Sequence, residues 1–174
     1  MATPTTLPAT FVAGNVLTAA EMNALRGAFR ILQVVSTSKL DGFSTSSTSL
    51  VDITGLSVSI TPSSASNKVL VIANSNLAHS STAGEILQLV RDSTALCVST
   101  AGSNLNGTFS SNIYNATNNQ SEPIAFSFLD SPATTSATTY KLQTQTATGT
   151  VYVNRNTAGT YASTSTITVM EVSA

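Results

Sequence analysis

The sequence predicts an antiparallel β-sandwich or jelly roll preceded by one short helix. From about residue 31 onward, hydrophobic residues recur at every second position in short runs, which is the period of half-buried strands. Turn-forming stretches such as TPSSASN, DSPATTS and TATG separate these runs, as in an all-β domain. A helical period occurs clearly in only one place, between residues 18 and 32.

The composition describes one folded domain with few charges. The chain has 174 residues, of which 41% are hydrophobic and only 9% are charged, so it can bury a core and covers its surface with Ser and Thr. Its net charge of −1 provides no attraction for nucleic acid or an anionic membrane. No apolar run approaches the ~20 residues of a membrane span. We therefore expect neither nucleic-acid binding nor membrane insertion.

The first 17 residues are expected to form an extended peptide. Pro4 and Pro8 lie among Thr and Ala, and proline disfavours helix at and before its own position. Since the segment also carries scattered hydrophobic residues, we expect it to dock onto another protein. These residues are Leu7, Phe11, Val12, Val16 and Leu17.

The stretch TAAEMNALRGAFRIL, residues 18–32, predicts an amphipathic helix. Thr18 and Glu21 have the spacing of a capping box. An apolar stripe follows with the 3-4-3 spacing of a heptad seam, formed by Met22, Leu25, Phe29 and Leu32. Two interpretations stay open: the stripe packs on the domain's own core, or it joins copies of the chain. A helix this short is marginal alone, which favours partner helices.

The strands are predicted from the alternating runs in chain order. Cys97 falls within one of them and is expected to be a small core residue. The predicted strands cover residues 31–38, 50–53, 56–60, 68–78, 85–91, 95–98, 108–114, 123–130, 139–145, 150–156 and 165–172.

The chain offers no recognisable reaction chemistry. It has one His and one Cys, and it lacks a nucleophile elbow, a phosphate-binding glycine loop and a dinucleotide motif. The carboxylates are scattered singly along the sequence. We therefore predict no catalytic residue, metal or cofactor. His79 is expected to be an ordinary strand-end or loop residue, although three copies could meet on the axis of a trimer and hold a metal or anion.

Two polar stretches, 101–122 and 154–165, predict loops that either face solvent or bind a ligand. Loops on a rigid β-scaffold often carry binding residues. Aromatic rings suit the C–H faces of sugars, and amides suit their hydroxyls. The candidate receptor-binding residues are Asn112, Tyr114, Asn115, Asn118, Asn156 and Tyr161.

The order of several segments resembles bacteriophage virion and fibre proteins. FVAGNVLTAAEMNAL (11–25) resembles a segment near the N-termini of phage tail and virion proteins. VDITGLSVSITPSSASNKVLV (51–71), LVRD (89–92), FLDSPATTSATTYKLQ (128–143), VYVNR (151–155) and STITVMEVSA (165–174) resemble their β-rich C-terminal domains. Those domains are jelly rolls of the C1q/TNF-like type and form trimers. The resemblance implies a homotrimer with a virion-anchoring peptide (1–17), a trimeric helix (18–32) and a β-head (33–174).

The resemblance implies a non-enzymatic virion structural protein. We expect a short trimeric fibre or spike that attaches to capsid or tail proteins through its N-terminus and exposes a head for a host-surface glycan. Because the first residues lack a signal-peptide pattern, we expect synthesis in the host cytoplasm. The alternatives are a capsid decoration protein, such as a head fibre without a receptor role, a cellular lectin or adhesin module, and a polysaccharide-degrading spike.

Overall fold

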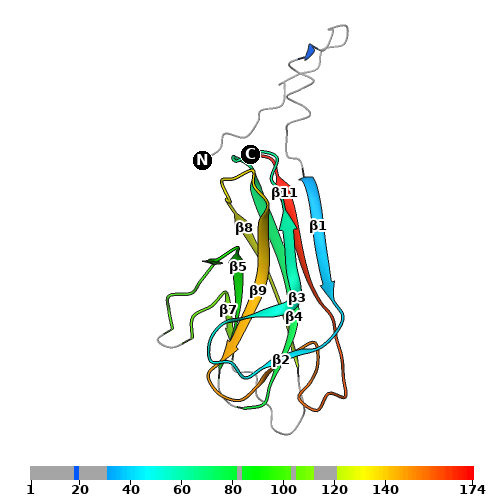
Figure 1. The fold of residues 1–174 in the computed structure, drawn as a ribbon, viewed down its shortest axis with the longest axis vertical. Coiled ribbons are helices and arrows are strands. Elements are labelled where there is room, and N and C mark those ends of the chain that lie inside the picture. Colours follow the sequence, from blue (N-terminus) through cyan, green and yellow to red (C-terminus); the bar gives the residue numbers. More distant parts are fainter. Residues whose placement is uncertain (1–17, 20–30, 82–83, 103–104, 112–120) are drawn as a thin grey trace, which may run out of the picture.

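In the computed structural model, two antiparallel β-sheets face each other (Figure 1). The structure describes residues 18–19, 31–81, 84–102, 105–111 and 121–174. The predicted anchor, most of the predicted helix and the stripe residues Met22, Leu25 and Phe29 therefore lie outside the described residues. The strands are β1 (Ile31–Lys39), β2 (Phe43–Thr45), β3 (Val51–Ile60), β4 (Lys68–His79), β5 (Glu85–Arg91), β6 (Thr94–Leu96), β7 (Phe109–Ser111), β8 (Glu122–Asp130), β9 (Thr138–Thr146), β10 (Val151–Val153) and β11 (Ser165–Val172).

The strand order of each sheet shows how the chain crosses between the two sheets. One sheet has the order β1-β11-β4-β10-β2, with β8 paired to the other edge of β4. The second sheet has the order β3-β9-β5-β6, with β7 also paired to β5. The long strands β1, β3, β4, β5, β8, β9 and β11 alternate between the two sheets along the chain. This alternation makes the domain an antiparallel β-sandwich, which confirms the predicted fold class at that level.

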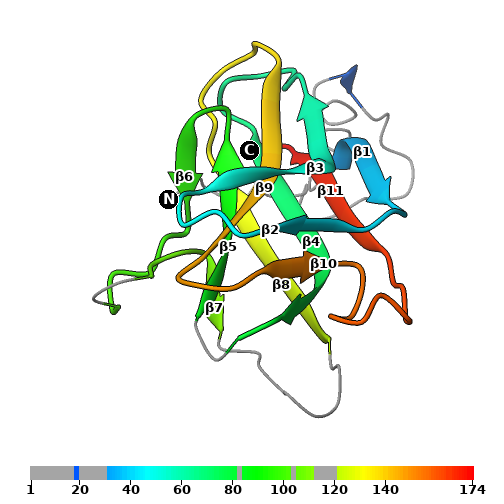
Figure 2. The same cartoon turned by 60° about the horizontal axis from the view of Figure 1, so that its bottom comes forward.

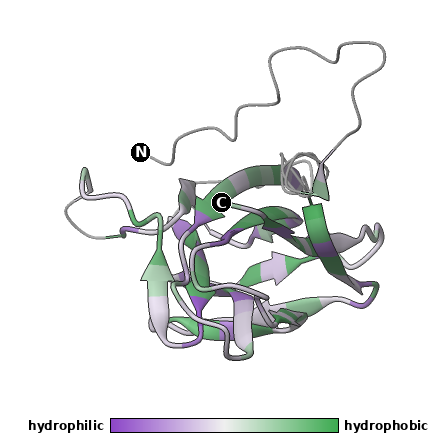
Figure 3. Ribbon diagram, turned by 90° about the horizontal axis from the view of Figure 1, so that it is seen from above, coloured by the Kyte–Doolittle hydropathy of each residue, from purple (hydrophilic) through white to green (hydrophobic). Residues whose placement is uncertain are grey.

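The core lies between the sheets because each strand points every second side chain inward. In β11, Ile167 and Val169 are fully buried, and Leu87, Leu89 and Leu142 of the other sheet are buried as well. Outward positions of β11 are only half-buried. In Figure 3 hydrophobic residues colour much of the strands, whereas most connecting loops are pale or purple. The alternation read from the sequence thus corresponds to the two faces of each sheet.

The strand β3 joins two runs that the sequence predicts as separate strands, 50–53 and 56–60. Its pairing with β9 shifts register between Asp52 and Ser57, so the intervening residues form a bulge. Gly55 lies in this bulge with φ 86°. Glycine tolerates such a left-handed conformation at little steric cost, which lets the strand continue past the irregularity.

Two predicted features need correction. Leu32 was expected to end a helix, but it lies in β1, because the β-branched residues Ile31, Val34 and Val35 favour a strand that pairs with β11. Cys97 was expected in the core, but it is exposed. The strand β6 ends at Leu96 because Cys97 has φ 51°, a conformation that ends the alternation of side chains between the faces.

The strand β5 is buried on both faces. Leu87 and Leu89 face the core, while Ile86 and Val90 point the other way and are nevertheless buried. A covering segment accounts for the burial of Ile86: a Cβ added at Gly107 would lie 3.1 Å from the Cβ of Ile86. The described part of the predicted 101–122 loop thus covers part of β5.

Candidate functional site

The sandwich has two distinct ends. We call the end where β1 begins and β11 ends the entry end, because the predicted anchor and helix precede β1. The opposite end, which we call the distal end, comprises residues 40–50, 147–150 and 154–164 together with β2 and β10 (Figures 1 and 2). Two of the candidate receptor-binding residues lie there, Asn156 and Tyr161. Asn112, Tyr114, Asn115 and Asn118 lie outside the described residues.

The distal loop 154–164 begins at a buried asparagine. Asn154 has φ 62°, which ends β10 at Val153 and not at residue 156, where the sequence predicts the end of the strand. Its side-chain amide donates to the carbonyl oxygens of Lys39 (3.0 Å) and Asp41 (3.2 Å). Its side-chain oxygen accepts a hydrogen bond from Ser165 Oγ at 2.5 Å. These bonds fix the start of the loop to β1 and β11.

Asn156 holds the loop together from inside, which corrects its predicted role in receptor binding. The residue is only 1% exposed. Its Oδ1 accepts hydrogen bonds from the backbone N–H groups of Thr160 (2.9 Å) and Tyr161 (3.2 Å), and its Nδ2 donates to Thr160 Oγ1 at 2.8 Å. Because both polar atoms of the side-chain amide are engaged within the loop, the amide has no atom left for a ligand.

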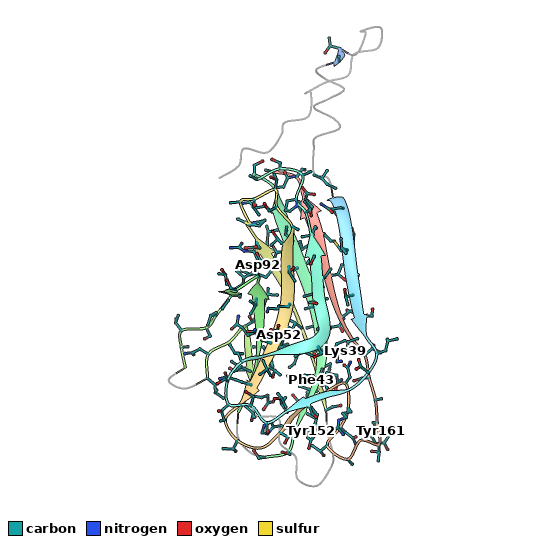
Figure 4. The ribbon with its side chains drawn as sticks, viewed as in Figure 1. Lys39, Phe43, Asp52, Asp92, Tyr152 and Tyr161 are labelled. Carbon is teal, nitrogen blue, oxygen red and sulfur yellow. The ribbon has the colours of Figure 1, made fainter. Side chains whose placement is uncertain are left out.

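Tyr161 is the candidate residue that the structure leaves accessible. Its exposed fraction is 75%, although aromatic side chains usually contribute to cores. Figure 4 shows Tyr152 and Tyr161 at the distal end of the ribbon. The backbone of Tyr161 is fixed through Asn156, while its ring extends into solvent. An exposed ring on a fixed backbone is suited to stacking against a ligand.

Arg155 lies in the same loop, and the sequence analysis did not single it out. Its guanidinium carbon lies 4.4 Å from the centre of the Tyr152 ring, a cation–π contact. Its backbone forms an isolated antiparallel bridge with Ala162, next to Tyr161. Tyr152 and Arg155 lie three residues apart in VYVNRN. The strand that the sequence predicts through residue 156 gave no reason to expect a contact between them. The distal end thus combines an accessible ring with a cation stacked on a second ring.

His79 does not support the alternative of a metal or anion site on a trimer axis. The residue is only 2% exposed. Its Nδ1 lies 2.7 Å from the carbonyl oxygen of Ser81, and its Nε2 lies 2.6 Å from Thr146 Oγ1. Both ring nitrogens are therefore engaged within one chain. Among the described residues, no group of three His, Cys, Asp or Glu side chains is placed to hold a metal ion.

The charged groups inside the sandwich have structural partners. Asp130 Oδ2 of β8 accepts hydrogen bonds from Arg91 (2.6 Å) and Tyr140 (2.7 Å) of the opposite sheet. Burial and the adjacent Asp130 carboxylate raise the pKa of Tyr140 far above its usual value. This cluster joins the two sheets.

Glu171 at the entry end is a second buried group with a structural role. Its carboxylate accepts hydrogen bonds from Asn67 Nδ2, Gln33 Nε2, Ser63 N and Ser63 Oγ at 2.5–2.7 Å. Burial alone would raise the pKa of Glu171, but these hydrogen bonds outweigh it and lower the pKa to about 2. The carboxylate thus remains charged although it is fully buried, and it ties β1, β11 and the loop between β3 and β4 together.

Comparisons with known proteins assign no family to the chain. None of the helices in the described ranges has the length and apolar character needed to span a membrane. No protein-family model matches the chain, and no curated protein matches it. The chain is similar to a solved structure titled "Structure of infectious bursal disease virus Gx strain", with 14% sequence identity and a TM-score of 0.39. That similarity covers 95% of this chain and 44% of the viral chain, so this chain spans less than half of its length.

Proposed function

We propose that this chain is a non-enzymatic structural component of a bacteriophage virion, a short homotrimeric fibre or spike. The N-terminal segment attaches it to capsid or tail proteins, and the sandwich points its distal end toward the host surface. Two kinds of support are combined. The sequence resembles phage fibre proteins, and the sandwich has an entry end next to the predicted anchor and a distal end with the candidate binding residues. The observation that carries it is an exposed apolar face beside the entry end.

This apolar face consists of four side chains in register on neighbouring strands, which we call the outer row. Val34 of β1 pairs with Met170 of β11, which pairs with Leu70 of β4, which pairs with Leu129 of β8. Val34 and Leu129 are each 55% exposed. Contiguous apolar surface of this kind typically marks a contact site, because monomeric soluble proteins keep such patches small.

A second copy of the same chain is the occupant that best fits the outer row. The row begins on β1, the strand that follows the predicted helix, and the exposed residues Ile31 and Leu32 link the two in sequence. The helix stripe and the outer row therefore form one continuous apolar surface in the proposal. On the side of the row away from the entry end, Ser36 Oγ and Thr168 Oγ1 bond each other at 2.8 Å, and this neighbouring pair is uncharged. Neutral, apolar surfaces suit contact between identical chains, which would otherwise bring like charges together.

A pair of substitutions tests the contact between copies. Leu129→Asp places a charge in the outer row and is expected to dissociate the trimer. Leu40→Asp is the matched control, because Leu40 is 73% exposed and lies outside the row, after the end of β1. Light scattering should report a mass near one chain for the first variant and an unchanged mass for the second. Equal masses for both variants would remove the outer row from the interface.

Immunogold labelling of intact virions tests the particle location. Label at regular positions on the capsid or tail supports a virion component, and unlabelled particles that contain no such chain contradict it. Adsorption of the isolated protein to host cells then separates two roles. Binding to cells supports a receptor-binding spike, whereas normal incorporation without binding indicates capsid decoration.

A further inference from the structure

We infer that Arg155, supported by Tyr152 and accompanied by Tyr161, forms a binding site for the carboxylate of an acidic sugar. This inference rests on the proposed contact between the distal end and a host-surface glycan, and it names the class of glycan. The carboxylate binds the guanidinium of Arg155, and the sugar ring lies against the exposed ring of Tyr161.

The first argument is that Arg155 has no anionic partner among the described residues. In the described part of the chain, the ion pairs are Lys39–Asp41, Arg91–Asp130 and Lys141–Asp52, and none includes Arg155. No described residue accepts a hydrogen bond from its guanidinium either. A guanidinium carries five N–H donors in a planar fork. These donors are available to a ligand from solvent.

The second argument is that the guanidinium is held in place although none of the residues in the described ranges pairs with its charge. One face rests on the Tyr152 ring at 4.4 Å. A Cβ added at Gly42 would lie 3.3 Å from Arg155 Cδ, and one added at Gly159 would lie 3.3 Å from Nη1. Two glycines thus leave the space that the side chain fills. Because the fork is already oriented, a ligand has to order less of the side chain on binding.

The third argument concerns the charge and shape of the ligand. A carboxylate is planar, carries one negative charge and matches the guanidinium fork with two parallel hydrogen bonds. The single positive charge of Arg155 matches the single negative charge of one carboxylate. Asp41, which precedes Gly42, pairs its Oδ1 with Lys39 Nζ at 2.7 Å, so its charge is matched by that of Lys39.

The fourth argument is the neighbouring aromatic ring. Tyr161 is adjacent to Ala162, the residue that bridges to Arg155, so the ring and the cation lie on one loop. The ring is 75% exposed and offers a flat apolar surface. A pyranose ring with a carboxylate presents both matching features, an apolar C–H face and a charged planar group. Neutral glycans present only the first.

The test measures binding of the full chain to oligosaccharides that contain glucuronate, galacturonate or N-acetylneuraminate, by calorimetry at low and high salt. The same oligosaccharides with their carboxyl groups reduced to alcohols serve as neutral probes. Arg155→Gln should weaken binding of the preferred acidic probe at least tenfold and leave the reduced probe unaffected. Arg155→Lys should recover part of the loss, because an ammonium keeps the charge but not the fork. High salt should weaken binding to the unmodified chain.

The matched control is Lys68→Gln, which removes the same charge from a residue whose Nζ bonds Ser131 Oγ, outside the distal end. It should bind the acidic probe as the unmodified chain does, and thermal unfolding should show that both variants are folded. Equal binding by Arg155→Gln and the unmodified chain overturns the inference, as does binding of none of the acidic probes. Neither result affects the virion role, which labelling of particles tests separately. If the particles are not labelled but the chain still binds acidic sugars, only the proposed virion role is contradicted.

Discussion

At the entry end Glu171 is fully buried and accepts four hydrogen bonds, whereas at the distal end Arg155 is half-buried and donates none to the described residues. Both side chains carry a full charge in a chain with very few charges. The difference separates a charge with a structural role from a charge that is available for binding. A buried charge with all its hydrogen bonds made holds strands together, and an oriented charge without a partner is available to bind.

The largest expected effect comes from neutralising the entry-end charge. Glu171→Gln removes one acceptor and directs an N–H₂ group at donors from Gln33, Ser63 or Asn67. Because buried donors then lose charge-assisted hydrogen bonds, we expect the free energy of unfolding to fall by about 2–4 kcal/mol. Denaturant unfolding measures this. Glu122→Gln, at the exposed start of β8, is the control and should change stability little. A loss of less than about 1 kcal/mol for Glu171→Gln would contradict a structural role.

The dependence of stability on acid pH is a second test of the structural role of Glu171. The pKa of Glu171 is about 2 in the folded chain and near 4.5 ordinarily, so the folded state binds this proton less tightly. Its contribution is therefore complete above pH 4.5 and is lost as the pH falls toward 2, by up to about 3 kcal/mol. Hydrogen bonds to Lys39, and to Gln143 and Lys141, also lower the pKa values of Asp41 and Asp52.

Unfolding measured between pH 6 and pH 2 should show a shallower acid loss in Glu171→Gln than in the unmodified chain. Asp41 and Asp52, whose pKa values are also lowered, should contribute to the slope that remains. Identical slopes for the two proteins would show that Glu171 titrates normally.

The smallest expected effect on stability is at the distal end. Arg155→Gln removes a cation–π contact with Tyr152, which contributes about 0.5–1 kcal/mol at sites of this exposure. We therefore expect the free energy of unfolding to fall by less than about 1 kcal/mol, even though ligand binding is lost. A loss as large as that of Glu171→Gln would show that Arg155 is structural and would end the contrast between the two ends.

The fold could be predicted largely because burial on one face imposes a period of two. The predicted run 165–172 coincides with β11, in which buried and half-buried side chains alternate. The predicted run 85–91 coincides with β5, although that strand is buried on both faces. The predicted helix overlapped the start of β1, because Leu32 fits both the heptad stripe and the strand pairing with β11. β2 was missed because its three residues between Gly42 and Ser46 are too few to show a period.

The candidate site was harder to predict because backbone conformation decides it. Tyr161 was found from its polar surroundings, and the structure leaves it accessible. Asn156 was misassigned because an amide in a polar loop can face either a ligand or its own backbone. Arg155 was missed because it depends on the left-handed conformation of Asn154, which ends β10 and turns the chain. A linear pattern does not reveal such a turn when the residue is not glycine.

The most direct test of the account is the mass of the unmodified full chain in solution. Light scattering across a range of concentrations should give three times the 17.9 kDa mass of one chain, because the proposed spike depends on copies that meet through the helix stripe and the outer row. A mass of one chain at every concentration would contradict the proposed trimer.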